Sequence, residues 1–283
     1  MKATSARLDR QYRTAFLTGA SAGLGAAFTG MLLEEHVRVW GTARALDRLQ
    51  PFQSHERFHP VVLDLHDAAA TARTFNEARD QADGFDLVIN NAGYGVFGPF
   101  IEEPFESWER QVQAMLVQPM RLAHLALRDF RQRGRGTLVN VASLAVEFPL
   151  PYLSGYNVVK AGLAAFSESL LVETAGTGIQ VIDFRPGDYR TGFNQVMSQL
   201  SPSAVAPSGA LPPARVWQVL EANLAAAPVA ARAAADLRAA LRRRAQGTVR
   251  SGSFFQASLA PTFAGWLPES LRRVVRWRYF GLR

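Results

Sequence analysis

The sequence predicts a single α/β domain built on a doubly wound parallel sheet, with a helical C-terminal extension. Two observations lead to this prediction. Short apolar runs alternate with helical segments between residues 14 and 193. The runs are apolar throughout, which is typical of parallel strands that helices cover on both faces. Right-handed crossovers between such strands give a doubly wound sheet.

The strands and helices of this unit follow one another in order. Apolar residues recur at helical spacing in each helical segment, as Ala26, Ala27, Met31 and Leu32 do in the first. Strands are expected at 15–18, 37–42, 61–63, 86–90, 137–142 and 179–184, and helices at 25–35, 68–81, 106–133 and 155–174.

The pattern changes after about residue 192, where Ser, Ala and Pro become frequent. Pro228 is expected to open one of the later helices. The expected segments are a loop at 198–214, helices at 215–227 and 229–245, an irregular stretch at 250–261, and a basic amphipathic helix at 267–280.

The chain thus divides into a polar extension (1–13), a core (14–193) and a C-terminal part (194–283) of the same domain. Its 283 residues are 48% hydrophobic and 19% charged, a globular balance. The absence of cysteine excludes a disulfide framework, a thiolate zinc site and a cysteine nucleophile, and no metal is expected. No run suits a secretory signal or a membrane span, so we expect a cytoplasmic protein.

The charge is unevenly distributed along the chain. The formal net charge is +7, yet residues 201–283 carry twelve arginines against three carboxylates, which leaves −2 for the rest. The basic excess therefore belongs to the last third. Lysine occurs only twice, as Lys2 and Lys160, so the interior Lys160 draws notice.

A glycine-rich turn joins the first strand to the first helix. Its glycines have the spacing G-x-x-x-G-x-G, and they allow a dinucleotide pyrophosphate to approach the backbone N–H groups at the helix start. An ordinary tight strand–helix loop would use the same glycines. The expected cofactor-binding residues here are Thr18, Gly19, Ser21, Ala22, Gly23, Leu24 and Gly25.

The end of the second strand indicates which dinucleotide binds. An acidic residue there would bind the ribose 2′-hydroxyl of NAD(H), but the sequence has Arg44, whose guanidinium suits a 2′-phosphate. NADP(H) is therefore favoured over NAD(H), unless Arg44 is simply a solvated loop residue. Asp64, with Leu65, is expected at the adenine, or else Asp64 caps a helix or turn.

Asn90, Asn91, Ala92 and Gly93 close the fourth strand. Small residues keep the backbone low, so that a flat ring and a ribose can lie across Ala92 and Gly93. The asparagine side chains are also suited to bridging neighbouring strands.

Tyr156 and Lys160 stand four residues apart on a predicted helix and share one face. The ammonium of Lys160 is expected to lower the pKa of Tyr156, which could then exchange a proton with a carbonyl or alcohol oxygen. Ser143, at the end of the preceding strand, is expected to hold the same oxygen. Such a tyrosine–lysine pair is common on helices and has no meaning by itself.

Together these residues resemble the short-chain dehydrogenase/reductase family over residues 14–193. The resemblance implies a Rossmann-type fold, a nicotinamide cofactor, and reversible hydride transfer to a carbonyl. It also implies that Pro186, Gly187 and Thr191 contact the nicotinamide end. The matching features are Thr18-Gly19-x-x-x-Gly23-x-Gly25, Asp64, Asn90-Asn91-Ala92-Gly93, Ser143, Tyr156-x-x-x-Lys160 and Pro186-Gly187-x-x-x-Thr191.

One position departs from the family pattern. The family places an asparagine on the long helix that helps to hold a proton-relay water, and this chain has Met115 there. A thioether donates no hydrogen bond and accepts only weakly. Gln118 lies near the same helix face and is a possible substitute.

The resemblance also implies that the C-terminal part covers the substrate, with residues 192–211 as a lid. Within the family, the chain is most similar to bacterial enzymes resembling 17β-hydroxysteroid and retinol dehydrogenases. An apolar pocket is expected, although the same residues would also suit an ordinary core. Its candidate residues are Phe148, Leu150, Tyr152, Phe193, Met197, Leu200 and Trp217.

The basic helix at 267–283 is expected to dock on its own domain or on a second subunit, with an anionic membrane surface as the less favoured alternative. Nucleic acid is not expected, because no recognition motif accompanies the charge. A homodimer or homotetramer is implied by the resemblance.

The leading prediction is an NADP(H)-dependent carbonyl reductase or alcohol dehydrogenase for an apolar carbonyl or alcohol substrate. The alternative is an NADP(H)-binding scaffold with weak or lost turnover.

Overall fold

A computed structural model describes residues 7–200, 212–253, 256–257 and 266–282 of the chain. Its centre is a seven-stranded parallel sheet in the order β3-β2-β1-β4-β5-β6-β7. The strands are β1 (Thr14–Leu17), β2 (Arg38–Ala43), β3 (Phe58–Val62), β4 (Leu87–Asn90), β5 (Gly136–Val141), β6 (Ile179–Pro186) and β7 (Gly247–Ser251). The doubly wound parallel sheet is confirmed.

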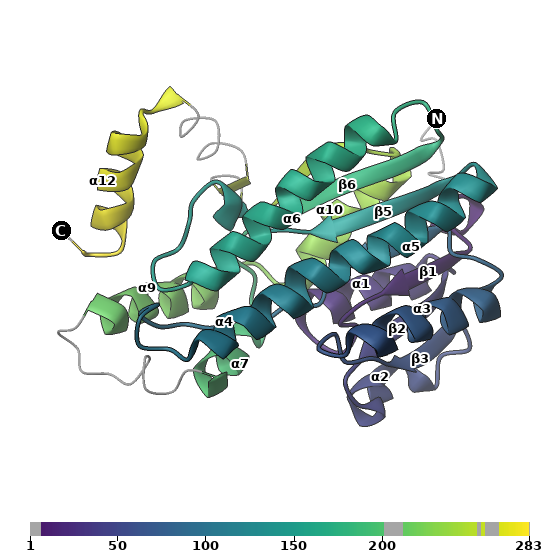
Figure 1. The fold of residues 1–283 in the computed structure, drawn as a ribbon, viewed down its shortest axis with the longest axis horizontal. Helices are drawn as coiled ribbons and strands as arrows, with labels where there is room; N and C mark the ends of the chain where they lie inside the picture. The colour runs from purple at the N-terminus through teal and green to yellow at the C-terminus, as the bar shows by residue number, and fades with distance from the viewer. Residues whose placement is uncertain (1–6, 201–211, 254–255, 258–265, 283) are drawn as a thin grey trace.

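Helices cover both faces of the sheet (Figure 1). The main ones are α1 (Gly23–Glu34), α3 (Ala68–Ala82), α4 (Phe105–Val112), α5 (Gln118–Arg133), α6 (Ser154–Glu173) and α10 (Ala230–Arg242). The others are α2 (Gln50–Gln53), α7 (Phe193–Leu200), α9 (Pro212–Ala226), α12 (Glu269–Tyr279) and the short turns η1 (Leu8–Arg10), η2 (Leu46–Leu49), η3 (Gln113–Val117) and η4 (Leu144–Val146).

The core lies in two layers, one on each side of the sheet. Phe28 of α1 and Leu237 of α10 pack in one layer with Phe184 of β6. The other layer joins α3, α5 and α6 to the opposite face of the sheet, where Phe16 meets Phe75 edge to face at 5.0 Å. Because β1 and β4 run side by side while their crossovers go to opposite edges, the carboxyl ends of these strands open a crevice.

The long helix expected at 106–133 is a continuous helical stretch in three parts. The middle part, η3, is a π-helical turn, followed at once by α5 with Pro119 in its first turn. A π-turn widens the helix by one residue and is common at functional sites. Its effect here is to place Met115 against the end of β4.

Two expectations for the C-terminal part are wrong. The stretch expected to be irregular from residue 250 begins inside β7, which pairs with β6 at Phe184 and Val249. The loop expected at 198–214, which overlaps the lid expected at 192–211, is helical at both of its described ends, because α7 covers Phe193–Leu200 and α9 begins at Pro212. Residues 201–211 lie outside the described residues.

The extension at 1–13 is not wholly peripheral. Leu8 and Tyr12 are buried in the same core layer as α1 and α10. Glu35 accepts a hydrogen bond from the Leu8 backbone N–H at 3.0 Å and pairs with Arg242 at 2.6 Å. This buried carboxylate ties the extension, the end of α1 and α10 together.

A third, smaller apolar cluster lies beyond the sheet. It joins residues before α4 and α6 to α7, α9 and the end of the chain, and Phe97 meets Trp217 of α9 at 5.1 Å. The cluster consists of Phe97, Leu153, Met197, Val216, Trp217, Leu220 and Phe280. In the described parts of the chain, the helices are too short or too polar to cross a membrane.

Candidate active site

A single cavity of about 1040 Å³ opens at the carboxyl ends of β1, β4, β5 and β6. Its size suits a dinucleotide together with a second small molecule. It reaches from the glycine turn after β1, past the ends of β4 and β5, to α7, α9 and α12. Every residue expected to be catalytic or to bind the cofactor lines this cavity except Thr18.

The glycine turn has the backbone that its sequence predicts. Gly19 and Gly23 have φ values of +71° and +54°, which L side chains rarely adopt. A Cβ at Gly25 would lie 1.9 Å from the Gly19 carbonyl oxygen, so only glycine fits there. Ala22, at the N-cap of α1, supplies no side-chain cap, which leaves the first N–H groups of the helix facing the cavity for an anion.

Thr18 is the one expected cofactor residue that the structure places elsewhere. It is 1% exposed, and its Oγ1 accepts hydrogen bonds from the backbone N–H groups of Asn91 and Ala92. Asn91 in turn donates from Nδ2 to the Thr18 and Gly19 carbonyl oxygens. Thr18 therefore joins the glycine turn to the end of β4, and it supports the turn without lining the cavity.

The asparagine bridge expected at the end of the fourth strand is also present. Asn90 donates from Nδ2 to Asn140 Oδ1 of β5 at 2.9 Å and to the Pro119 carbonyl oxygen at 3.0 Å. Asn90 thus ties β4 to β5 and to α5. Ala92 and Gly93 line the cavity.

Two arginines face the cavity beyond β2. Arg44 follows the strand and Arg48 lies one turn further on, in η2, and both side chains are exposed. Arg48 was not foreseen, although its spacing of four residues from Arg44 was a readable signal. The nearby Asp47 accepts the Arg48 backbone N–H instead of facing the cavity. This end of the site is built for a negatively charged group.

Asp64 and Leu65 line the cavity next to the arginines. Asp64 Oδ1 accepts the backbone N–H of His66 at 3.0 Å, so the carboxylate also forms the turn after β3. His66 lines the same wall and was not foreseen.

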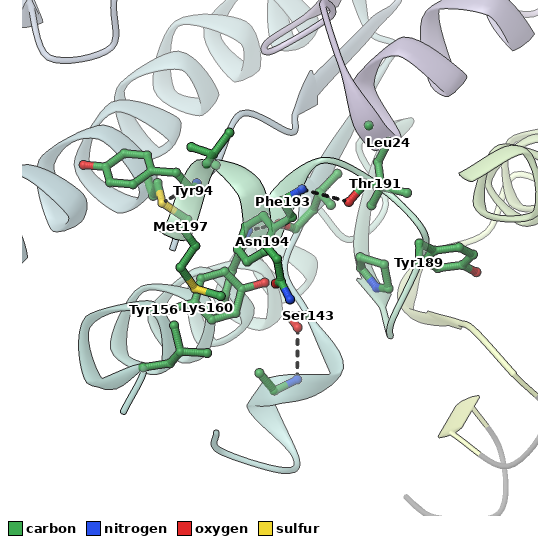
Figure 2. Close-up of a pocket in the computed structure, with 18 of the residues that line it drawn as sticks. Leu24, Tyr94, Ser143, Tyr156, Lys160, Tyr189, Thr191, Phe193, Asn194 and Met197 are labelled. Carbon is green, nitrogen blue, oxygen red and sulfur yellow. Dashed lines mark hydrogen bonds between the residues drawn. The ribbon is translucent and has the colours of Figure 1, made fainter. Parts of the chain in front are cut away.

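Ser143, Tyr156 and Lys160 gather on one side of the cavity (Figure 2). Ser143 follows β5, and its Oγ accepts the backbone N–H of Ala145 at 3.1 Å, which fixes its rotamer. Lys160, one turn after Tyr156 on α6, has Nζ 5.6 Å from the centroid of the Tyr156 ring and donates to the Val141 carbonyl oxygen at 2.7 Å. The end of β5 and helix α6 thus hold these three side chains in place.

The pKa of Tyr156 moves in the direction opposite to the one expected. Burial raises it above the usual range, the hydrogen bond with Ser143 opposes this, and the charge of Asp188 raises it further. Burial also lowers the pKa of Lys160 to about 8, partly opposed by Asp183. In the chain alone, desolvation is therefore the largest influence on both pKa values, and it outweighs the Ser143 hydrogen bond at Tyr156 and the charge of Asp183 at Lys160.

Asp188 is a carboxylate at the site that was not foreseen. It lines the cavity, accepts a hydrogen bond from Gln256 Nε2 at 2.7 Å, and has a pKa raised by burial. It lies between Gly187 and Thr191, and the family pattern names only Pro186, Gly187 and Thr191 in this segment. Pro186, Gly187 and Thr191 line the cavity as well.

Met115 fills the position where an asparagine was expected. It is 2% exposed, and its Sδ accepts the Tyr94 backbone N–H at 3.2 Å. A Cβ added at Gly93 would lie 3.0 Å from Met115 Cε and 3.7 Å from Lys160 Nζ, so both side chains approach Gly93. Gln118 is buried and does not line the cavity, so its side chain does not replace the asparagine there.

The remainder of the cavity is largely apolar. Phe193 of α7 meets the Tyr156 ring at 5.7 Å, and Met197 follows one turn later. Tyr152 and Trp217, also expected here, do not line the cavity but pack around Phe97. The side chain of Leu200 lies outside the described residues. The apolar lining includes Leu144, Phe148, Leu150, Leu153, Phe193, Met197, Leu220, Val275 and Phe280.

Comparison with known proteins shows which family has a matching sequence. The family model described as short chain dehydrogenase matches residues 13–200. A probable NADP-dependent dehydrogenase of Haemophilus influenzae is 31% identical over 177 residues, 62% of this chain and 70% of that protein. Serine 3-dehydrogenase of Rhizobium radiobacter is 30% identical over 188 residues, 65% of this chain and 74% of that protein.

A solved structure shows the same fold. A short-chain dehydrogenase from Streptomyces avermitilis superposes with a TM-score of 0.74, covering 98% of this chain and 97% of that chain at 24% identity. The likeness therefore extends beyond the matched core into the C-terminal part.

Proposed function

The chain belongs to the short-chain dehydrogenase family of oxidoreductases, and on this premise we propose that it is an NADP(H)-dependent carbonyl reductase, or alcohol dehydrogenase, for an apolar substrate. The observation that carries the proposal is the single cavity. One end combines an open helix N-terminus with Arg44 and Arg48, the middle holds Ser143, Tyr156 and Lys160, and the far end is apolar.

The residues present fit NADP(H). The N–H groups at the start of α1 would hold the pyrophosphate. Arg44 and Arg48 would bind the 2′-phosphate. The name of the Haemophilus influenzae relative includes dependence on NADP, which supports the same preference. When bound, the nicotinamide supplies or accepts the hydride.

Tyr156 would donate its phenolic proton to the carbonyl oxygen in reduction and take it back in oxidation. Ser143 would donate a hydrogen bond to the same oxygen and hold it as negative charge develops. Tyr156 is protonated at neutral pH, but burial raises its pKa and so makes it a weaker acid in the chain alone. The charge of Lys160 would oppose that rise when Tyr156 gives up its proton and would also attract the cofactor.

The substrate class follows from the walls of the cavity. Phe193, Met197 and Leu220 enclose the space beyond Tyr156 with apolar surface. Burial of apolar substrate surface there provides the binding free energy. Resemblance to steroid and retinol dehydrogenases in particular stays a prediction.

Following NADPH consumption with a panel of carbonyl compounds tests the proposal. Steroid ketones, retinal, acyl-thioester ketones and short polar keto acids form the panel. Turnover is expected with at least one large apolar ketone, with kcat/KM well above that for the short keto acids. Turnover confined to the short polar keto acids would contradict the apolar class.

Lys160 predicts how cofactor affinity depends on pH. Its pKa of about 8 means that its charge is present below that pH and is lost above it. We expect NADPH affinity to fall as the pH rises through about 8, because the ammonium no longer attracts the anionic cofactor. Fluorescence titrations across this range measure the effect. Lys160→Met should bind NADPH more weakly at neutral pH and show no such step; an identical step in this variant would assign the titration to another group.

Met115 supports a second candidate function, an NADP(H)-binding scaffold with little turnover. Met115 lines the same cavity as Lys160, at the position where the family has a hydrogen-bonding asparagine. If the missing amide limits proton delivery, Met115→Asn should raise kcat about tenfold with little change in NADPH affinity. Steady-state kinetics of the two proteins decide, and an unchanged kcat would mean that the relay does not depend on this side chain.

A further inference from the structure

The last described helix, α12, presents an apolar stripe to solvent. All eleven residues of α12 are described, and none is buried. Four apolar side chains at helical spacing are 40–59% exposed, and Trp266 just before the helix is 86% exposed. The α12 stripe consists of Trp266, Leu271, Val274, Val275 and Tyr279.

The helix is attached mainly at its C-terminal end. Phe280 is buried in the cluster that contains Trp217, and Tyr279 Oη donates to Asn223 Oδ1 of α9 at 3.0 Å. Figure 1 shows α12 at one end of the molecule, away from the sheet and its covering helices. The docking on its own domain expected for this helix is thus limited to its end, and the described part of the chain leaves the stripe exposed.

The helix that carries the stripe is strongly basic. It has Arg272, Arg273, Arg276 and Arg278 against the single carboxylate of Glu269. Arg272 and Arg276 lie 3.8 Å and 3.4 Å from Glu269. Arg278, which helical spacing places within the stripe, and Arg273, on the opposite face, are exposed and form no ion pair with any described residue. An exposed apolar stripe on a basic helix matches an interfacial helix on anionic lipid.

We propose that α12 binds the surface of an anionic membrane. Leu271 and Val274 would enter the boundary between headgroups and acyl chains, and Arg278 beside them would bind lipid phosphates, while the arginines elsewhere on the helix would add electrostatic attraction. Trp266 would lie at the headgroup level, where amphipathic aromatic rings are most stable.

The same helix forms a wall of the active-site cavity. Arg272, Val275 and Tyr279 line it, so the cavity lies beside the proposed membrane-facing side. An apolar substrate dissolved in the bilayer would then reach the cavity next to the helix. The membrane site itself rests on α12 and not on the proposed reaction.

A second copy of the chain is a less suitable occupant. In a two-fold symmetric contact the stripe would face itself, which would bring Arg278, within the stripe, close to Arg278 of the other copy. Like charges placed together oppose such a contact. Phosphate groups of anionic lipids complement the same arginines.

Co-sedimentation with lipid vesicles tests the proposal on the full chain. The probes are phosphatidylcholine vesicles with and without about 30% phosphatidylglycerol, at low salt and at about 0.5 M salt. We expect binding to the anionic vesicles at low salt, at least tenfold weaker binding to the neutral ones, and marked loss of binding at high salt. No pelleting with anionic vesicles at low salt would overturn the proposal.

Variants locate the binding on the helix. Arg273→Gln/Arg278→Gln should weaken it at least about fivefold, since an arginine at an anionic surface, as Arg278 would be, contributes about 1 kcal/mol. Leu271→Asn/Val274→Asn should weaken it at least tenfold by removing apolar surface. None of these four residues lines the cavity, so NADPH binding should be unchanged in both variants.

A double substitution of two arginines elsewhere on the surface controls for the loss of net charge. Arg73→Gln/Arg131→Gln takes two exposed arginines from α3 and α5 and should change vesicle binding less than about twofold. An equal loss in this pair would show binding through overall charge and overturn the site. Light scattering adds the last criterion: if Leu271→Asn/Val274→Asn breaks an oligomer of the wild-type chain, the stripe is a subunit interface and the proposal is wrong.

Discussion

Tyr156→Phe is expected to reduce kcat by about 10³-fold while NADPH affinity stays within a few-fold of the wild type. The substitution removes only the phenolic oxygen, and general acid catalysis by a positioned side chain contributes on the order of 10²–10⁴ in rate. The ring keeps its contact with Phe193 at 5.7 Å, so the fold and the apolar wall are retained. Steady-state kinetics with NADPH and the best ketone of the panel measure the effect.

Tyr152→Phe is the matched control for this experiment. Tyr152 lies four residues earlier, in the turn before α6, and packs on Phe97 at 5.9 Å, outside the cavity. It loses the same oxygen and should leave kcat unchanged. A Tyr156→Phe enzyme that keeps more than about a tenth of the wild-type kcat would show that another group supplies the proton.

Arg44→Ala/Arg48→Ala is expected to shift the cofactor preference towards NADH. Both guanidinium groups face the adenine end of the cavity, where no carboxylate follows β2 directly. Loss of two charge-assisted contacts to the 2′-phosphate should lower kcat/KM for NADPH about 10- to 100-fold. The value for NADH, which has no such phosphate, should change little.

The ratio of the two kcat/KM values is the decisive quantity here. Arg73→Ala, an exposed arginine on α3 that does not line the cavity, should leave the ratio unchanged. If the ratio in the double variant equals that of the wild type, Arg44 and Arg48 do not read the phosphate.

The sequence predicted the first six strands along the chain and the helices between them because their apolar pattern is strong. It also brought Ser143, Tyr156 and Lys160 together, since fixed spacing on a helix and at a strand end determines their meeting. The edge strand β7 was missed because Gly247–Ser251 has one apolar residue and only one neighbouring strand. A short edge strand carries too little periodic signal to stand out from a loop.

Other features depend on tertiary surroundings. Thr18 sits in the glycine motif, but only the packing of β1 against β4 shows that its hydroxyl faces Asn91 and Ala92. The pKa of Tyr156 depends on its burial, which spacing from Lys160 does not reveal. Asp188 meets Gln256 only through the fold, across 68 residues of chain.

Transfer of a labelled hydride tests the central claim most directly. The enzyme is incubated with an apolar ketone and NADPH deuterated at both C4 positions of the nicotinamide, and the alcohol product is examined by mass spectrometry. The account predicts one deuterium on the former carbonyl carbon, with product formation about 10³-fold slower in Tyr156→Phe. Tight binding of the labelled NADPH with no alcohol formed, or an alcohol without deuterium, would contradict it.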